Sequence, residues 1–170
     1  MLTKKEIMSA FSAIGCDVED RKIEENWFFF TKNDIHYEVQ IDVEWNNNDA
    51  KYLAILCPVM GMVSEKKYGY ILEHAVKMLQ DDLKERGIDQ YQVNYDPDEC
   101  CADSCAIMSC SNRNYEQLCD ALESLFIFDA NVNETIQKNV IAGVNAMESE
   151  SDANAYCYHV GDEKMLSLRN

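Results

Sequence analysis

The sequence predicts an α+β domain in which helices cover one face of a mainly antiparallel sheet. One segment alternates apolar and polar side chains with the period of a β-strand, which gives the predicted sheet one apolar face. The apolar members of this segment are Tyr37, Val39, Ile41, Val43 and Trp45. Further apolar runs at residues 27–31 and 52–59 flank it beyond polar, turn-forming segments. Amphipathic helical patterns elsewhere in the chain supply the cover that this face needs.

The first predicted helix spans residues 3–14. Thr3 and Glu6 have the spacing of a capping box, in which each side chain binds a free backbone N–H of the first turn. Apolar side chains then recur at helical spacing and form one stripe. Gly15 follows, where a left-handed residue commonly ends a helix.

A second helix is predicted from about Tyr68 to Arg86, ending at Gly87. Its apolar stripe consists of Leu72, Val76, Leu79 and Leu83. A helix packed on a sheet needs a stripe a little wider than about 100°, which these four residues already provide. Three more apolar residues widen the stripe to one side, namely Ile71, Ala75 and Met78. We therefore expect these three to form the surface of a homodimer.

The second half of the chain predicts two strands and a long helix. Residues 91–95 and 104–110 are the strands, and an Asp-Pro turn lies between them. Beyond Asn112 or Asn114, a helical stripe runs to about Gly143. The predicted order is α-β-β-β-α-β-β-α in a single domain of residues 1–143. Residues 144–170 are rich in acidic and polar residues, which predicts a partly disordered tail.

The charge balance limits the partners that we expect. Thirty-one acidic residues oppose 15 basic ones, which gives a formal net charge of −16. Such a surface repels nucleic-acid phosphates and anionic lipids, so the sequence predicts neither a nucleic-acid nor a membrane partner. No run approaches the ~20 apolar residues that a membrane-spanning helix needs. The N-terminal segment lacks the apolar stretch of a signal peptide, and we expect a cytoplasmic location.

Eight cysteines include one cluster, formed by Cys100, Cys101, Cys105 and Cys110. No two of them have the Cys-x2-Cys spacing that zinc ribbons and fingers use, and no histidine lies near. The surrounding acidic residues raise thiol pKa values, which disfavours a nucleophilic thiolate. The sequence therefore predicts no catalytic, cofactor-binding or metal-binding residues. A metal- or thiol-dependent protein that uses this cluster is the alternative hypothesis.

The order and lengths of these elements resemble those of type III secretion chaperones and of the bacterial YbjN-like proteins. The resemblance covers residues 3–143. Its elements are the helix at 3–14, the strands within 27–59, the helix at 72–83, the strand pair within 91–110 and the helix at 115–126.

This resemblance implies a domain that holds segments of other proteins against helix and sheet surfaces. Such domains are acidic, cytoplasmic and commonly dimeric, and they have no active site. We therefore expect a non-catalytic protein-binding module, chaperone-like or regulatory, whose partner is another protein or a peptide segment.

Overall fold

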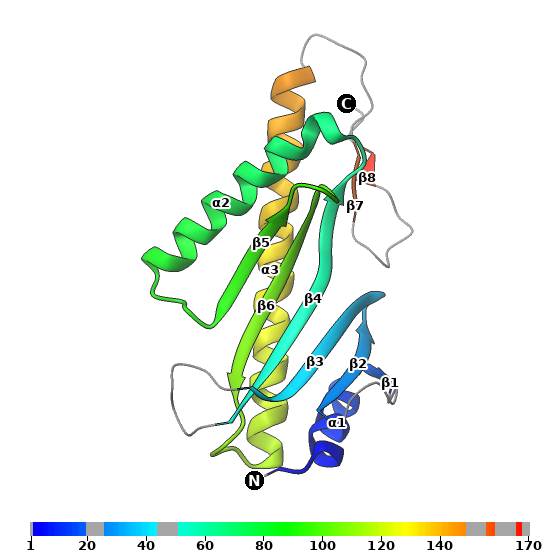
Figure 1. The fold of residues 1–170 in the computed structure, drawn as a ribbon, viewed down its shortest axis with the longest axis vertical. Coiled ribbons are helices and arrows are strands. Elements are labelled where there is room, and N and C mark those ends of the chain that lie inside the picture. Colours follow the sequence, from blue (N-terminus) through cyan, green and yellow to red (C-terminus); the bar gives the residue numbers. More distant parts are fainter. Residues whose placement is uncertain (1, 20–25, 44–50, 149–155, 159–165, 168–170) are drawn as a thin grey trace.

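The centre of the molecule is an antiparallel sheet (Figure 1). The computed structural model describes residues 2–19, 26–43, 51–148, 156–158 and 166–167. The six main strands are β1 (Asp17–Glu19), β2 (Trp27–Lys32), β3 (Ile35–Val43), β4 (Tyr52–Val63), β5 (Tyr91–Asp96) and β6 (Cys101–Ser109). They are arranged in the order β1-β2-β3-β4-β6-β5, which makes β5 an edge strand.

Three α-helices pack on this sheet: α1 (Lys4–Ala13), α2 (Gly69–Glu85) and α3 (Tyr115–Glu148). A short 3-10 helix, η1 (Lys66–Tyr68), leads into α2. The α+β class is confirmed. The predicted capping box is confirmed as well, because the Thr3 backbone N donates to Glu6 Oε2 at 2.7 Å and Glu6 N donates to Thr3 Oγ1 at 3.3 Å. No helix among the described residues has the length and apolar character that crossing a membrane requires.

The core lies between the helices and the apolar sheet face. Phe11 of α1 contacts the rings of Phe28 and Phe30 of β2, and it also contacts Phe126 of α3. The expected facing of β3 is confirmed for Tyr37, Val39 and Ile41, which are buried. Val43, predicted on the same face, is only half-buried, because the pairing with β4 shifts register between Ile41 and Val43. Trp45, the last member of the predicted alternation, lies outside the described residues.

Helix α3 differs from the prediction in its length. It continues to Glu148 instead of ending near Gly143, because the apolar stripe extends one more turn to the buried Val144. The predicted domain boundary at residue 143 therefore falls inside a helix. Two segments of the predicted tail form short strands: β7 (Tyr156–Tyr158) pairs with β4, and β8 (Leu166–Ser167) pairs with β7. The remaining tail residues lie outside the described part.

Among the described residues, no helix lies on the opposite face of the sheet. Cross-strand register aligns Trp27 with Gln40, Gln40 with Ala54, and Ala54 with Ile107. Because side chains alternate along each strand, these residues point away from the face that holds the core. Gln40 is the polar member of this row, Trp27 and Ile107 are half-buried, and Ala54 is buried.

The two faces of β3 predict different responses to truncation. Ile41→Ala should lower the free energy of unfolding by about 2–5 kcal/mol, because it removes buried methylene groups and leaves a cavity. Gln40→Ala, the matched control on the opposite face, should change it by about 0.5 kcal/mol or less. Urea unfolding followed by circular dichroism measures both. Equal effects of the two substitutions would contradict this assignment of the faces.

Candidate functional site

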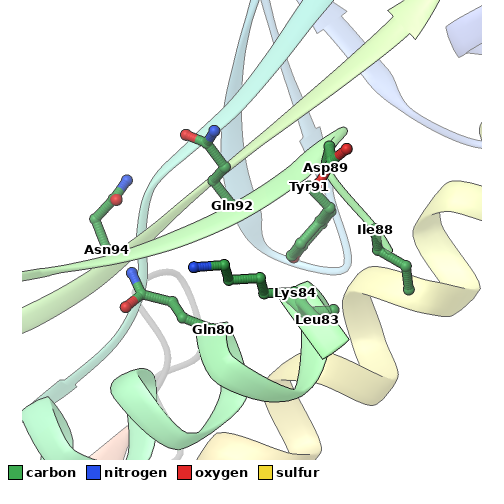
Figure 2. A pocket seen from close by; sticks show the side chains of 8 residues that line it. All are labelled: Gln80, Leu83, Lys84, Ile88, Asp89, Tyr91, Gln92 and Asn94. Atoms are coloured by element: carbon green, nitrogen blue, oxygen red, sulfur yellow. The ribbon is translucent and has the colours of Figure 1, made fainter. Parts of the chain in front are cut away.

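A groove runs between the free edge of β5 and helix α2 (Figure 2). Its volume is about 330 Å³. Helix α2 contributes Gln80 and Lys84, which lie one turn apart and so share one side of the helix. Strand β5 contributes Tyr91 and Asn94 from the other side. Leu83, which lies between the two polar residues of α2, is buried and holds the helix against the core.

The outer edge of β5 faces α2, which covers it, since Val93 is fully buried and Tyr91 is 4% exposed. Ile107 N of β6 donates to Gln90 O at 2.7 Å, which sets the phase of the hydrogen-bond ladder. In an antiparallel pair, alternate residues direct both backbone groups to the partner strand. Gln92 and Asn94 therefore bond to β6, and Tyr91, Val93 and Tyr95 direct their N–H and C=O groups outward.

One side chain of α2 already uses this edge. The Gln80 side-chain amide donates a hydrogen bond to Val93 O across the groove. This bond confirms that the Val93 carbonyl points away from β6, and Val93 is fully buried beneath α2. A side-chain amide occupies the position that the backbone N–H of an added strand would take.

A second hollow adjoins the groove and shares Ile88 and Tyr91 with it. It has a volume of about 580 Å³ and lies between the end of β6 and helix α3. Ile107, Leu125 and Phe128 supply much of its apolar lining. The edge of β5 therefore offers backbone hydrogen bonds, and an apolar hollow lies next to it.

Tyr91 ties the groove to a buried polar centre. Its hydroxyl donates to Asp129 Oδ1, and the hydroxyl of Tyr37 donates to Asp129 Oδ2 at 2.8 Å. Ser104 Oγ donates to the same carboxyl group at 3.4 Å. Asp129 lies on α3, is 6% exposed, and receives these bonds from β3, β5 and β6. The polar centre thus holds three strands to one helix.

The groups around Asp129 are held in their protonated forms. Burial raises the pKa values of Tyr37 and Tyr91 well above the ordinary tyrosine value, and the negative charge of Asp129 raises them further. Burial also raises the pKa of the Cys57 thiol, and Asp129 adds to the shift. Phenols and a thiol that keep their protons are hydrogen-bond donors, and a nucleophile or general base would need the opposite shift.

A further hollow of about 400 Å³ lies between α3 and the hairpin of β2 and β3. Several of its polar groups bond to other parts of the chain. Tyr37 bonds to Asp129, Lys32 Nζ donates to Ile14 O at 2.6 Å, and Asn133 Nδ2 donates to Met60 O at 3.3 Å. These bonds hold the core together, and the groove at β5 is therefore the stronger candidate for binding a partner.

Three members of the cysteine cluster are held in the thiol form. Burial raises the pKa values of Cys101, Cys105 and Cys110, and nearby aspartates raise them further. Cys100 lies at the turn before β6, with a positive φ of 52°. Within the described ranges, no three His, Cys, Asp or Glu side chains gather as metal ligands would.

The structure corrects the predicted dimer surface. Ile71 and Ala75 are only 8% and 2% exposed, and of the three predicted residues only Met78 is exposed, at 51%. Ile71 packs on α3, where a Cβ added to Gly143 would lie 2.6 Å from Ile71 Cγ2. The glycine lets the two helices approach closely. The apolar stripe of α2 is wide because α2 contacts both the sheet and the part of α3 around Gly143.

The sequence analysis did not identify Asp129, Gln80 or Lys84 as functional candidates. Asp129 had a detectable signal, because it lies three residues after Phe126 and three before Val132, within the apolar stripe of α3. A carboxyl group at such a position needs buried hydrogen-bond partners. Gln80 and Lys84 had no such signal, since a polar helix flank looks the same beside a groove or in open solvent.

The buried tyrosines predict a loss of stability at alkaline pH. Tyr37 and Tyr91 ionise near pH 10 in the unfolded chain and at higher pH in the folded one, so the folded state binds more protons above about pH 10. The free energy of unfolding should fall there by about 1.4 kcal/mol per pH unit for each buried tyrosine.

Tyr37→Phe tests this prediction. It should reduce the alkaline slope by about 1.4 kcal/mol per pH unit and should lower stability at pH 7 by about 1–3 kcal/mol, because Asp129 loses a donor. Tyr70→Phe, at a side chain 55% exposed, is the matched control and should keep the wild-type slope. Urea unfolding between pH 7 and 11 measures the slopes, and an unchanged slope in Tyr37→Phe would contradict the assignment.

The cysteine cluster yields a separate prediction. Purified protein should carry far less zinc than one ion per chain, and EDTA should leave its far-UV circular dichroism unchanged. A structural zinc ion contributes directly to folding, so its removal unfolds a protein that depends on it. Loss of helical signal on chelation would favour the metal-dependent alternative.

Comparisons with known proteins show a similarity in fold alone. No protein-family model matches the sequence, and no curated protein matches it. The chain is similar to the crystal structure of an uncharacterized protein from Methanothermobacter thermautotrophicus, with a TM-score of 0.54 and 14% sequence identity. The match covers 82% of this chain and 99% of that one. The two proteins therefore share a fold over most of their lengths.

Proposed function

We propose that this protein is a non-catalytic protein-binding module, chaperone-like or regulatory, that takes an extended segment of a partner protein along the edge of β5. The observation that carries the proposal is the outward-facing backbone of Tyr91, Val93 and Tyr95 beside α2. Because α2 covers this edge and Val93 is fully buried, binding requires α2 to move away from β5. An edge strand uncovered in this way is a template for another strand.

The proposed mode of binding is strand addition. The backbone of the partner segment pairs with the outward N–H and C=O groups of β5, and Gln80 releases Val93 O to the incoming strand. Backbone hydrogen bonds supply affinity that depends little on sequence, and side chains that reach α2 or the adjoining hollow supply selectivity. This division suits a module that recognises a short segment of a larger protein.

The chemistry of the polar groups supports a binding role over a catalytic one. Burial raises the pKa values of the Tyr37 and Tyr91 hydroxyls and of the Cys57 and Cys105 thiols, so these groups stay protonated near neutral pH. A thiol-dependent enzyme would need a lowered pKa at its nucleophile. A metal- or thiol-dependent function of the cysteine cluster therefore has the weaker support.

The charge of the chain bears on the class of partner and on location. A net charge of −16 disfavours phosphate backbones and anionic lipid surfaces, so we propose a protein partner in the cytoplasm. Self-association through Ile71 and Ala75 is excluded by their burial. A homodimer would have to use another surface, and antiparallel pairing of two β5 edges would likewise require α2 to move away from them.

A displayed library of 12-residue peptides tests the proposal. Peptides selected on the full chain should slow amide exchange at Tyr91 and Tyr95, whose N–H groups face outward, because strand addition places these groups in a new ladder. Val93 is fully buried, so its amide should exchange slowly with and without peptide. Exchange at Gln92 and Asn94 should be slow with and without peptide. Heteronuclear NMR measures all five amides.

Backbone N-methylation of a selected peptide provides the matched control. Methyl groups on alternate residues along the paired edge should abolish binding, and methyl groups on the intervening residues, which point away from β5, should leave the Kd nearly unchanged. Equal effects of the two patterns would rule out strand addition. Slow exchange of the Tyr91 and Tyr95 amides in the peptide-free protein at high concentration, with a dimer mass in light scattering, would indicate pairing of two β5 edges instead.

A further inference from the structure

The hollow of about 400 Å³ between α3 and the hairpin of β2 and β3 has the composition of a small-molecule site. Ligand sites in proteins have volumes of about 300–1,000 Å³, with mainly apolar walls and a few polar groups that orient the ligand. The apolar residues of this lining come from the end of α1, the hairpin and α3, namely Ile14, Ile35, Phe126, Ile127 and Ala130. Ile127 is largely exposed, so solvent reaches a large apolar side chain of the lining.

The lining also contains a buried carboxyl group that has no cationic partner. Apart from tyrosines and cysteines, the buried polar or charged side chains among the described residues are Ser104, Asp129 and Asn133, and the last two line the hollow. The three groups that donate to Asp129 are hydroxyl groups, which carry no positive charge. No ion pair within the described ranges involves Asp129. A buried carboxylate is complemented best by a charged donor, and the described part of the chain supplies none.

One acceptor position of this carboxylate is left on the side of the hollow. An ionised carboxylate has about four lone-pair sites, two on each oxygen. Tyr91 and Ser104 donate to Oδ1 of Asp129, whereas Tyr37 alone donates to Oδ2. Tyr37 and Asp129 line the hollow, and the two donors to Oδ1 do not. The remaining position on Oδ2 therefore lies where a molecule in the hollow can donate to it.

Two more charged side chains line the hollow, those of Lys32 and Glu123. Lys32 Nζ donates to Ile14 O at 2.6 Å and lies 5.4 Å from the centre of the Phe126 ring. Carbonyl groups at the C-terminal end of a helix attract a cation, and α1 has no basic residue in its last turn. Lys32 therefore supplies the cation at the end of α1. The carboxyl groups of Glu123 and Asp129 together outnumber this single ammonium group.

We propose that this hollow binds a small organic cation, a protonated amine with an apolar body, whose ammonium group donates to Asp129 Oδ2. The apolar body lies against the aliphatic and aromatic side chains of α3 and of the hairpin. The net charge of −16 attracts cations to the protein and repels anionic ligands. This inference goes beyond the proposed function, because it concerns a small molecule in a hollow to which β5 contributes no residue.

Three small molecules with similar apolar bodies and different head groups test the inference. 2-Phenylethylamine, 2-phenylethanol and 3-phenylpropionate are titrated into the 15N-labelled full chain at pH 7, where a primary amine is protonated. Amide shifts of residues 32–37 and 126–133 report binding in the hollow. The amine should bind with a Kd about tenfold lower than that of the alcohol, because a hydrogen bond between charged groups is the stronger one. The carboxylate should bind most weakly.

Two variants separate the effect of charge from the effect of space. Asp129→Asn keeps the shape of the side chain and removes its charge, so the preference for the amine should fall to about twofold or less. Ala130→Phe fills the hollow from an exposed position of α3 and should abolish the shifts caused by the amine. Ala142→Phe is the matched control and should bind the amine as the wild type does, since Ala142 is exposed on the same helix and does not line the hollow.

The outcomes distinguish this proposal from strand addition at β5. Equal affinities for the amine and the alcohol would overturn the inference, and so would a wild-type Kd for the amine in Ala130→Phe. Absence of amine-induced shifts up to the solubility limit would overturn it as well. Circular dichroism verifies that each variant is folded, and if Asp129→Asn is not, the three head groups and the two alanine variants still test the inference. Binding or failure of the amine leaves strand addition at β5 unaffected.

Discussion

The burial of one carboxyl group, Asp129, constrains much of this structure. A charged or polar group that is 6% exposed must be hydrogen-bonded, because an unpaired one loses its hydration without compensation. Tyr37, Tyr91 and Ser104 supply the donors from three different strands. These bonds form only when α3 lies across the sheet at one position along its axis. Apolar packing alone would tolerate small shifts of the helix, and the polar centre does not.

This constraint reaches the surface through Tyr91. The hydroxyl of Tyr91 binds Asp129 inside the core, and its backbone faces outward at the edge of β5. The edge strand is therefore fixed at the point where a partner strand would begin to pair. A preorganised edge lowers the entropy lost on binding, which matters for a short segment that forms few contacts.

Free sheet edges favour unwanted association, and the two edges of this sheet limit that association in different ways. At one end, β1 contains only three residues, which offers little length for pairing. At the other end, β5 has six residues, and α2 lies beside it with Gln80 on the Val93 carbonyl. A helix beside the edge restricts access to an extended chain that fits the groove. This arrangement limits aggregation at the edge of β5.

The sequence by itself determined the local elements, and only the tertiary structure decided the site. Alternation in β3 and the Thr3–Glu6 cap follow from local backbone geometry, so short-range patterns predicted them and the α+β class. The exposure of Ile71 and Ala75 depended on Gly143, about 70 residues away, and the pattern within α2 carried no trace of that contact. The groove exists because β6 lies between β4 and β5 in the sheet, which leaves β5 at the edge beside α2. Strand order is a long-range property, since it depends on which strands pair across the whole chain.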